Sequence, residues 1–164
     1  MALVLAALLA LLLLAALLMM KGRNRNATIE ELLEQLQEVD LSALRASGKQ
    51  SNRKQLAVVF RAIMRIRHNA SILLALIECC TFAAHSAEER REIEYNIAHL
   101  RRTALSARLN GLIAMLEVGR LWLSAGSLHY AVNAAKQYED MMGSGVQIFL
   151  LVRPELTAKL ESAF

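Results

Sequence analysis

The four histidines have the widest chemical range of any side chains in this sequence, and their spacing limits what they can do. They are His68, His85, His99 and His129. No two of them lie four residues apart, and none follows a glutamate by three residues, so the helical motifs of zinc proteases and di-iron proteins are missing. A lone imidazole is either the single axial ligand of a haem or pigment, or an ordinary surface or partly buried residue. We predict the second, with no metal and no cofactor.

Glu78 is the other candidate for chemistry because it lies within the apolar stretch SILLALIECC, residues 71–80. A buried carboxyl group has a raised pKa unless a cation pairs with it. Arg108 and Arg120 are the arginines expected to supply that cation. One interpretation is a structural ion pair or a carboxylate that faces solvent. The other is a polar contact that fixes the register of a partner.

The motifs of nucleophilic catalysis and phosphate binding are missing from the sequence. It contains no Gly-x-Ser-x-Gly, the motif that carries the nucleophile of many hydrolases. The stretch Gly143-Ser144-Gly145 lacks the lysine and the preceding strand of a phosphate-binding loop. We interpret it as a hinge loop between helices, and we predict that the chain is not an enzyme.

A basic stripe, Lys54, Arg61, Arg65 and His68, follows one face of the first half of a long predicted helix. Three interpretations remain open. The stripe is a solvated face, or it contacts anionic lipid headgroups or a partner at the membrane, or it contacts nucleic acid. The third is the least expected, because aromatic residues make up only 5% of the chain and its net charge is only +4. Nucleic-acid binding usually needs stacked aromatics and stronger positive charge.

The first 20 residues carry no charged side chain. As a helix they would span roughly 30 Å, the thickness of a hydrocarbon core. No basic residue precedes them and bulky residues end the run, whereas a cleaved signal has a basic start and a small-residue cleavage site. Lys21, Arg23 and Arg25 follow directly, and positive charges favour the cytoplasmic side. We predict an uncleaved transmembrane anchor at 1–20, a polar linker at 21–27, an outside N-terminus and a cytoplasmic domain. The alternative is a cleaved signal and an exported domain.

The elements that position these residues are expected to be helices. The composition is 55% apolar with one proline and seven glycines, and its leucines and alanines are strong helix formers. Thr28 with Glu31, and Ser86 with Glu89, have the spacing of capping boxes. The predicted helices are 28–44, 51–84, 87–124, about 128–142 and a short one from Pro154, with 146–152 left open as helix or buried strand. The fold class is all-α, with a single N-terminal transmembrane helix followed by a four- or five-helix bundle or helical-hairpin array at 28–164.

Two of these helices carry apolar seams in which spacings of three and four alternate, the pattern of packed helices. The seam of 51–84 is Leu56, Val59, Ile63, Ile66, Ala70, Leu73, Ile77, Cys80 and Ala84. The middle of the seam of 87–124 consists of small residues that allow another helix to approach closely. They are Ala104, Ala107, Gly111 and Ala114. Trp122 and Tyr130 are interpreted either as anchors of such a helix-packing interface or as core residues.

Together these features favour a structural role. The first hypothesis is a non-catalytic, membrane-anchored accessory, scaffold or assembly subunit of a larger complex, which binds protein partners or further copies of itself. The alternative is a membrane-surface regulator that binds anionic lipid or nucleic acid through the basic stripe. A second alternative is a cofactor-carrying or enzymatic subunit that uses a lone histidine or Glu78.

Overall fold

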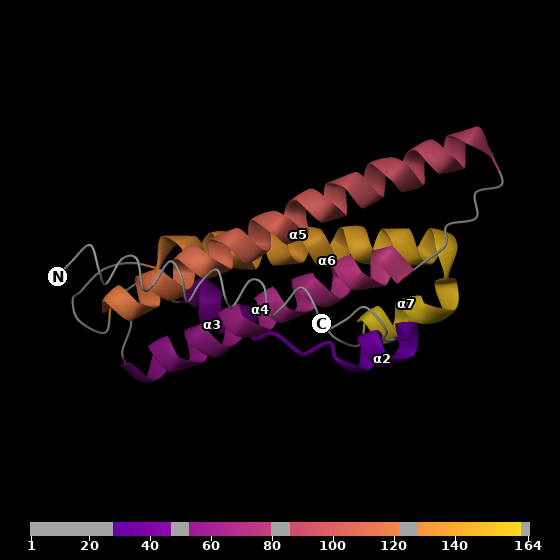
Figure 1. Ribbon diagram of the computed structural model, residues 1–164. Coiled ribbons are helices and arrows are strands. Elements are labelled where there is room, and N and C mark those ends of the chain that lie inside the picture. Colours follow the sequence, from indigo (N-terminus) through magenta and orange to yellow (C-terminus); the bar gives the residue numbers. More distant parts are fainter. Residues whose placement is uncertain (1–27, 47–52, 80–85, 122–127, 162–164) are drawn as a thin grey trace, which may run out of the picture.

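The computed structural model describes residues 28–46, 53–79, 86–121 and 128–161. Within these ranges the chain contains helices and no strand (Figure 1), which confirms the all-α prediction. The described helices are α2 (Ile29–Glu34), α3 (Leu41–Ala46), α4 (Arg53–Cys79), α5 (Ala87–Leu121), α6 (His129–Val152) and α7 (Pro154–Glu161).

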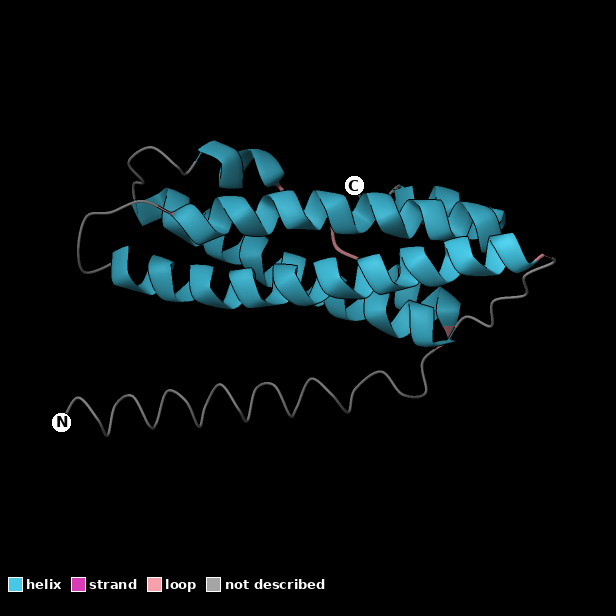
Figure 2. Cartoon of the chain, turned by 90° about the horizontal axis from the view of Figure 1, so that it is seen from above, coloured by secondary structure: helices cyan, strands magenta, loops and turns pink. Residues whose placement is uncertain are grey.

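Three long helices, α4, α5 and α6, form the body of the fold. Their directions alternate along the chain, and Figure 1 and Figure 2 show them lying side by side. α5 packs against both α4 and α6, and α4 also packs against α6. The short helices cover this body: α7 folds back onto α6, α2 packs on α4, and α3 packs on both α4 and α6. The arrangement is an antiparallel helical bundle, as predicted.

The prediction of a single helix over 28–44 is wrong, because two short helices occupy this region. Thr28 and Glu31 form the predicted capping box at the start of α2, but α2 ends at Glu34. Residues 35–40, called the linking segment below, form no helix. The apolar spacing of the region suits one helix, so the break has its cause elsewhere in the fold.

Asp40 directly precedes the second short helix, α3, and caps its N-terminus. Its Oδ1 accepts a hydrogen bond from Ser42 Oγ (2.6 Å) and another from the backbone N–H of Ala43 (3.1 Å). This is how an N-cap residue satisfies the first turn of a helix. The bond from Ser42, followed by the bond from Ala43, lowers the pKa of the exposed Asp40 carboxyl.

α6 runs through the stretch that was predicted to be a hinge loop, so that prediction is wrong. Ser144 and Gly145 are buried within the helix, and residues 146–152, left open above, are helical. A Cβ atom added to Gly145 would lie 3.6 Å from Leu73 Cδ2 and 3.7 Å from Leu160 Cδ2. Gly145 therefore lies directly against side chains of α4 and α7, where a Cβ atom would make ordinary van der Waals contact.

Gly143 offers a direct test of this helical continuity. It is exposed, and nothing lies within 4 Å of a Cβ added there. Gly143→Ala is expected to stabilise the fold by about 1 kcal/mol, because alanine loses less backbone entropy than glycine in a helix. Thermal denaturation followed by circular dichroism should show the midpoint rising by about 2–4 °C. Gly119→Ala in α5, also in open space, is the matched control with the same expected gain. A fall in the Gly143→Ala midpoint would indicate a turn.

The predicted seams are confirmed as the core. In α4 the seam residues within the described ranges are all buried: Leu56, Val59, Ile63, Ile66, Ala70, Leu73 and Ile77. Ile72 and Leu76 are buried as well, so the second half of α4 is central, as its all-round apolar sequence indicated. α7 begins at Pro154 as predicted. It inserts Leu156 and Leu160 into the same core.

The predicted transmembrane anchor lies outside the described residues, as do its flanking Lys21, Arg23 and Arg25. Among helices α2 to α7, none is both long enough and apolar enough to cross a bilayer. The anchor stays a prediction from the sequence.

Candidate functional site

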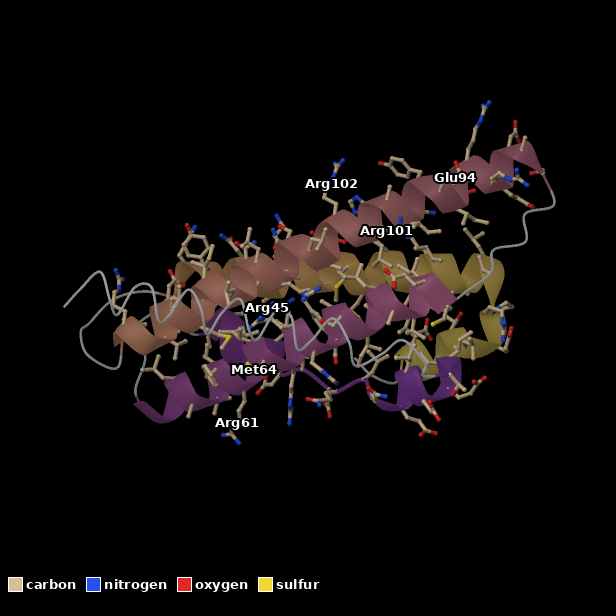
Figure 3. The ribbon with its side chains drawn as sticks, in the orientation of Figure 1. Arg45, Arg61, Met64, Glu94, Arg101 and Arg102 are labelled. Carbon is tan, nitrogen blue, oxygen red and sulfur yellow. The ribbon has the colours of Figure 1, made fainter. Side chains whose placement is uncertain are left out.

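Two of the four residues of the basic stripe, Arg65 and His68, form hydrogen bonds within the fold. Arg65 Nη1 donates a hydrogen bond to the Glu38 carbonyl oxygen (2.9 Å), and His68 Nε2 donates to the Gln35 carbonyl oxygen (3.0 Å). Both acceptors belong to the linking segment. Arg61 is exposed and points away from α5 (Figure 3), with its Nε donating to the Ala57 carbonyl oxygen (3.3 Å). The side chain of Lys54 lies outside the described atoms.

Asn69 completes the attachment of the linking segment, and no motif of the sequence pointed to it. The residue is fully buried. Its Oδ1 accepts from the Gln37 N–H (3.0 Å), while Nδ2 donates to the Gln37 carbonyl oxygen (2.7 Å) and to Tyr138 Oη (2.8 Å). An amide side chain that bonds both backbone groups of one residue replaces the hydrogen bonds of a helix there. This is the physical reason for the break between α2 and α3.

The Tyr138 hydroxyl is the α6 end of this buried network. Burial raises the pKa of Tyr138, and the hydrogen bond from Asn69 offsets part of that rise. The neutral phenol is therefore the form that the fold favours. The three groups tie the linking segment, α4 and α6 together. The side chains of Asn69 and Tyr138 are buried, away from the solvent from which a substrate could bind.

The residues first considered for chemistry are dispersed. Glu78 is exposed at the end of α4, as in the solvent-facing interpretation. His99 stacks on Tyr95 and His129 meets the ring edge of Tyr130, with ring centroids 6.5 and 5.8 Å apart. His85 lies outside the described residues. Within 28–46, 53–79, 86–121 and 128–161, no three His, Cys, Asp or Glu side chains gather as metal ligands.

The small-residue face of α5 is buried inside the bundle. Ala104, Ala107, Gly111 and Ala114 are all in the core, so within this chain they serve the packing of α5 on α4 and α6. Tyr130 is 37% exposed, and its backbone N–H donates to Glu117 Oε2 (2.9 Å). Trp122 lies outside the described residues. The surface that a partner could reach must therefore be sought on another face.

Gly111 makes room for a buried arginine, Arg67, which the sequence pattern did not single out. A Cβ added to Gly111 would lie 2.9 Å from Arg67 Cγ. Only 7% of Arg67 is exposed. Its Nη1 donates to the sulfur of Met115 (3.1 Å), and its Nε has no hydrogen-bond partner among the described residues. Burial, and then the positive charge of Arg108, lower the pKa of Arg67.

A row of leucines lies on the solvent side of α5, and it is called the leucine row below. Leu105, Leu109 and Leu116 are 58%, 58% and 51% exposed, and Leu112 between them is half-buried. At 100° per residue these four positions fall on the side opposite the buried alanines, with spacings of four, three and four. The row is about 16 Å long. The sequence feature that could have indicated the leucine row is that the second half of α5 is apolar on two faces.

Arginines surround the leucine row. The second half of α5, residues 101–121, carries four arginines and one glutamate: Arg101, Arg102, Arg108, Arg120 and Glu117. Arg102 is exposed and points away from α4 and α6 (Figure 3). The half before it, residues 87–100, carries four glutamates and two arginines. α5 is thus polarised, and its positive half is the one that exposes leucine.

No protein family, curated protein or solved structure matches this chain.

The leucine row with its arginines is the surface of the described residues that is best suited to binding. Burying the exposed part of each leucine would contribute about 1 kcal/mol. Contiguous apolar side chains on a surface mark binding sites more often than scattered ones do. The chemistry available here is apolar contact combined with attraction of negative charge.

Proposed function

We propose that this chain is a non-catalytic docking subunit, whose helical bundle binds an acidic amphipathic helix of a partner protein along the leucine row. The observation that carries the proposal is the exposure of Leu105, Leu109 and Leu116 on one line of α5. The proposal includes the membrane anchor at 1–20, with Lys21, Arg23 and Arg25 on the inner side. The bundle would then present its binding surface next to a membrane, as an accessory or assembly subunit of a complex.

The narrowness of the leucine row favours a helix over a lipid surface. A helix that lies on a membrane exposes a broad apolar face, of about 100° or more, whereas a seam for one partner helix is a narrow line with alternating spacings of three and four. The leucine row is of the second kind. Arg102 and Ser106 lie on one side of it along α5, and Arg108 lies on the other.

The charge of the surface favours an acidic partner over a second copy of this chain. If two leucine rows paired in antiparallel fashion, Leu105 would face Leu116 and Arg101 would approach Arg120 of the other copy. If they paired in parallel, Arg101 and Arg102 would meet their own counterparts. Like charges across an interface disfavour it. A partner helix with glutamate or aspartate beside its apolar line avoids this repulsion.

Photo-crosslinking tests the proposal in the full-length chain in native membranes. A photoreactive amino acid replaces Leu109, and mass spectrometry maps the crosslinked peptide. We expect a helical segment of another protein with acidic residues beside its apolar line. For the test variant the photoreactive amino acid is moved to Leu112, and Leu105→Gln and Leu109→Gln are introduced together. The yield of crosslinked product should fall at least tenfold, because two apolar contacts are lost.

The matched control is Leu150→Gln with Leu151→Gln, which changes two exposed leucines on α6 and should leave the yield unchanged. Raising the salt concentration should reduce the yield by screening the arginines. The proposal fails if the crosslinks are to lipid, to another copy of this chain, or to a segment without acidic residues. It also fails if both leucine pairs have the same effect.

A further inference from the structure

Arg67 is a buried cation that receives no negative charge from its neighbours among the described residues. Its side chain is 93% buried, as the 7% exposure implies, and the one hydrogen bond that the structure gives it is to the sulfur of Met115. Thioether sulfur is a weak acceptor. Within the described ranges Arg67 forms no ion pair, and its Nε lacks a partner. A buried charge without an opposite charge is strongly destabilising.

A second arginine increases this cost. Arg108 lies one turn before Gly111, the residue of α5 that meets the stem of Arg67, and its positive charge adds to the effect of burial in lowering the pKa of Arg67. Arg108 and Met115 are both half-exposed, so the head of Arg67 lies just beneath the surface where α4 meets α5. The structure keeps α5 close to the stem of Arg67 by placing Gly111 there. The packing of α4 on α5 at Gly111 therefore brings two positively charged residues to the same helix contact.

We infer that Arg67 and Arg108 form a binding site for a phosphate group at the junction of α4 and α5. Guanidinium groups bind phosphate through paired N–H donors. A phosphate monoester carries a charge of about −1.5 to −2 near neutral pH, which balances two arginines, whereas a single carboxylate would leave one positive charge. The phosphate group comes either from a soluble molecule or from the headgroup of a lipid, and both offer the same oxygens. The inference stands apart from the leucine row and does not depend on the partner proposed for it.

Thermal denaturation of the full-length chain in a neutral detergent tests the site with two probes. One is inorganic phosphate against chloride at equal ionic strength. The other is phosphatidic acid against phosphatidylcholine, each mixed into the micelles. We expect a rise of about 3–5 °C in the midpoint at probe concentrations well above the dissociation constant. A rise with inorganic phosphate assigns the site to soluble phosphate groups, and a rise with phosphatidic acid alone assigns it to a lipid.

Arg67→Met is the decisive variant, because methionine keeps much of the apolar stem and removes the charge. We expect it to fold, with an unchanged or higher midpoint without phosphate, and to lose the response to the probe. Arg102→Met, which changes an exposed arginine of the same surface, should keep the full response. If Arg67→Met does not fold, Arg108→Gln at a half-exposed position decides instead, with a loss of at least tenfold in phosphate affinity by calorimetry. No response to either probe, or an equal response in every variant, overturns the inference.

Discussion

Asn69→Ala is expected to lower the free energy of unfolding by about 3 kcal/mol, because it removes three hydrogen bonds of a buried side chain at once. The Gln37 N–H, the Gln37 carbonyl oxygen and the Tyr138 hydroxyl all bond to this side chain at 2.7–3.0 Å. Tyr138 is almost fully buried, so its hydroxyl would lose a partner where water does not replace it. Urea denaturation of the two proteins, fitted with a common slope, measures the difference.

Two control variants separate this network from ordinary helix effects. Ser71→Ala changes a half-buried polar residue of the same helix whose hydroxyl donates to the backbone carbonyl oxygen of Arg67, and it should cost less than about 1 kcal/mol. Tyr138→Phe removes one of the three bonds and should cost about 1 kcal/mol. If Asn69→Ala costs no more than Ser71→Ala, the linking segment is not held by this side chain.

Gly111→Leu is expected to destabilise the fold by about 3 kcal/mol, through crowding at the contact between α4 and α5. A Cβ at this position already lies 2.9 Å from Arg67 Cγ, 3.2 Å from Arg67 Cδ and 3.5 Å from Ile63 Cγ2. The remaining carbons of a leucine would have to displace the arginine stem or separate the helices, and such overpacking costs about 1–3 kcal/mol or more. The higher helix propensity of leucine, worth up to about 1 kcal/mol, offsets only part of that cost.

Gly119→Leu is the matched control for this substitution. Gly119 lies two turns further along α5 and has nothing within 4 Å of an added Cβ, so only the gain in helix propensity applies there. Thermal midpoints of the two variants should differ by about 8 °C or more. Equal midpoints would mean that α4 and α5 do not approach each other at Gly111, which would also remove the geometric basis of the phosphate site.

Local patterns in the sequence predict the features of this fold that depend on local interactions. The capping boxes of Thr28 and Ser86 form as predicted, because their partners lie three residues away. The inner seams of α4 and α5 are buried as predicted, since spacings of three and four repeat over many turns. Pro154 begins α7 for a similar reason, its fixed φ suiting a first turn.

The features that the sequence does not predict depend on residues far apart in the chain. The break at 35–40 comes from Asn69, about 30 residues away. The continuity of α6 through Gly143-Ser144-Gly145 places Gly145 against Leu73 of α4 and Leu160 of α7. Glycine and serine mark turns in isolation, so their role in packing becomes visible only when the helices are assembled.

The candidate site illustrates the same limit. The sequence drew attention to the small residues of α5 and to the basic stripe of α4, and the fold uses the first for its core and half of the second for its linking segment. The leucine row went unrecognised, because two apolar faces on one helix do not reveal which of them the chain itself covers. Arg67 went unrecognised because one arginine among several basic neighbours has no distinctive spacing.

The attachment of the linking segment has a mechanical consequence. Tension on the chain ahead of Thr28 reaches the bundle first through the packing of α2 on α4 and then through residues 35–40. Three side chains within little more than one turn of α4 form hydrogen bonds to this segment. Arg65 bonds to Glu38, His68 to Gln35 and Asn69 to Gln37. A force on this segment is therefore distributed over several hydrogen bonds, all of which attach it to the same helix, α4.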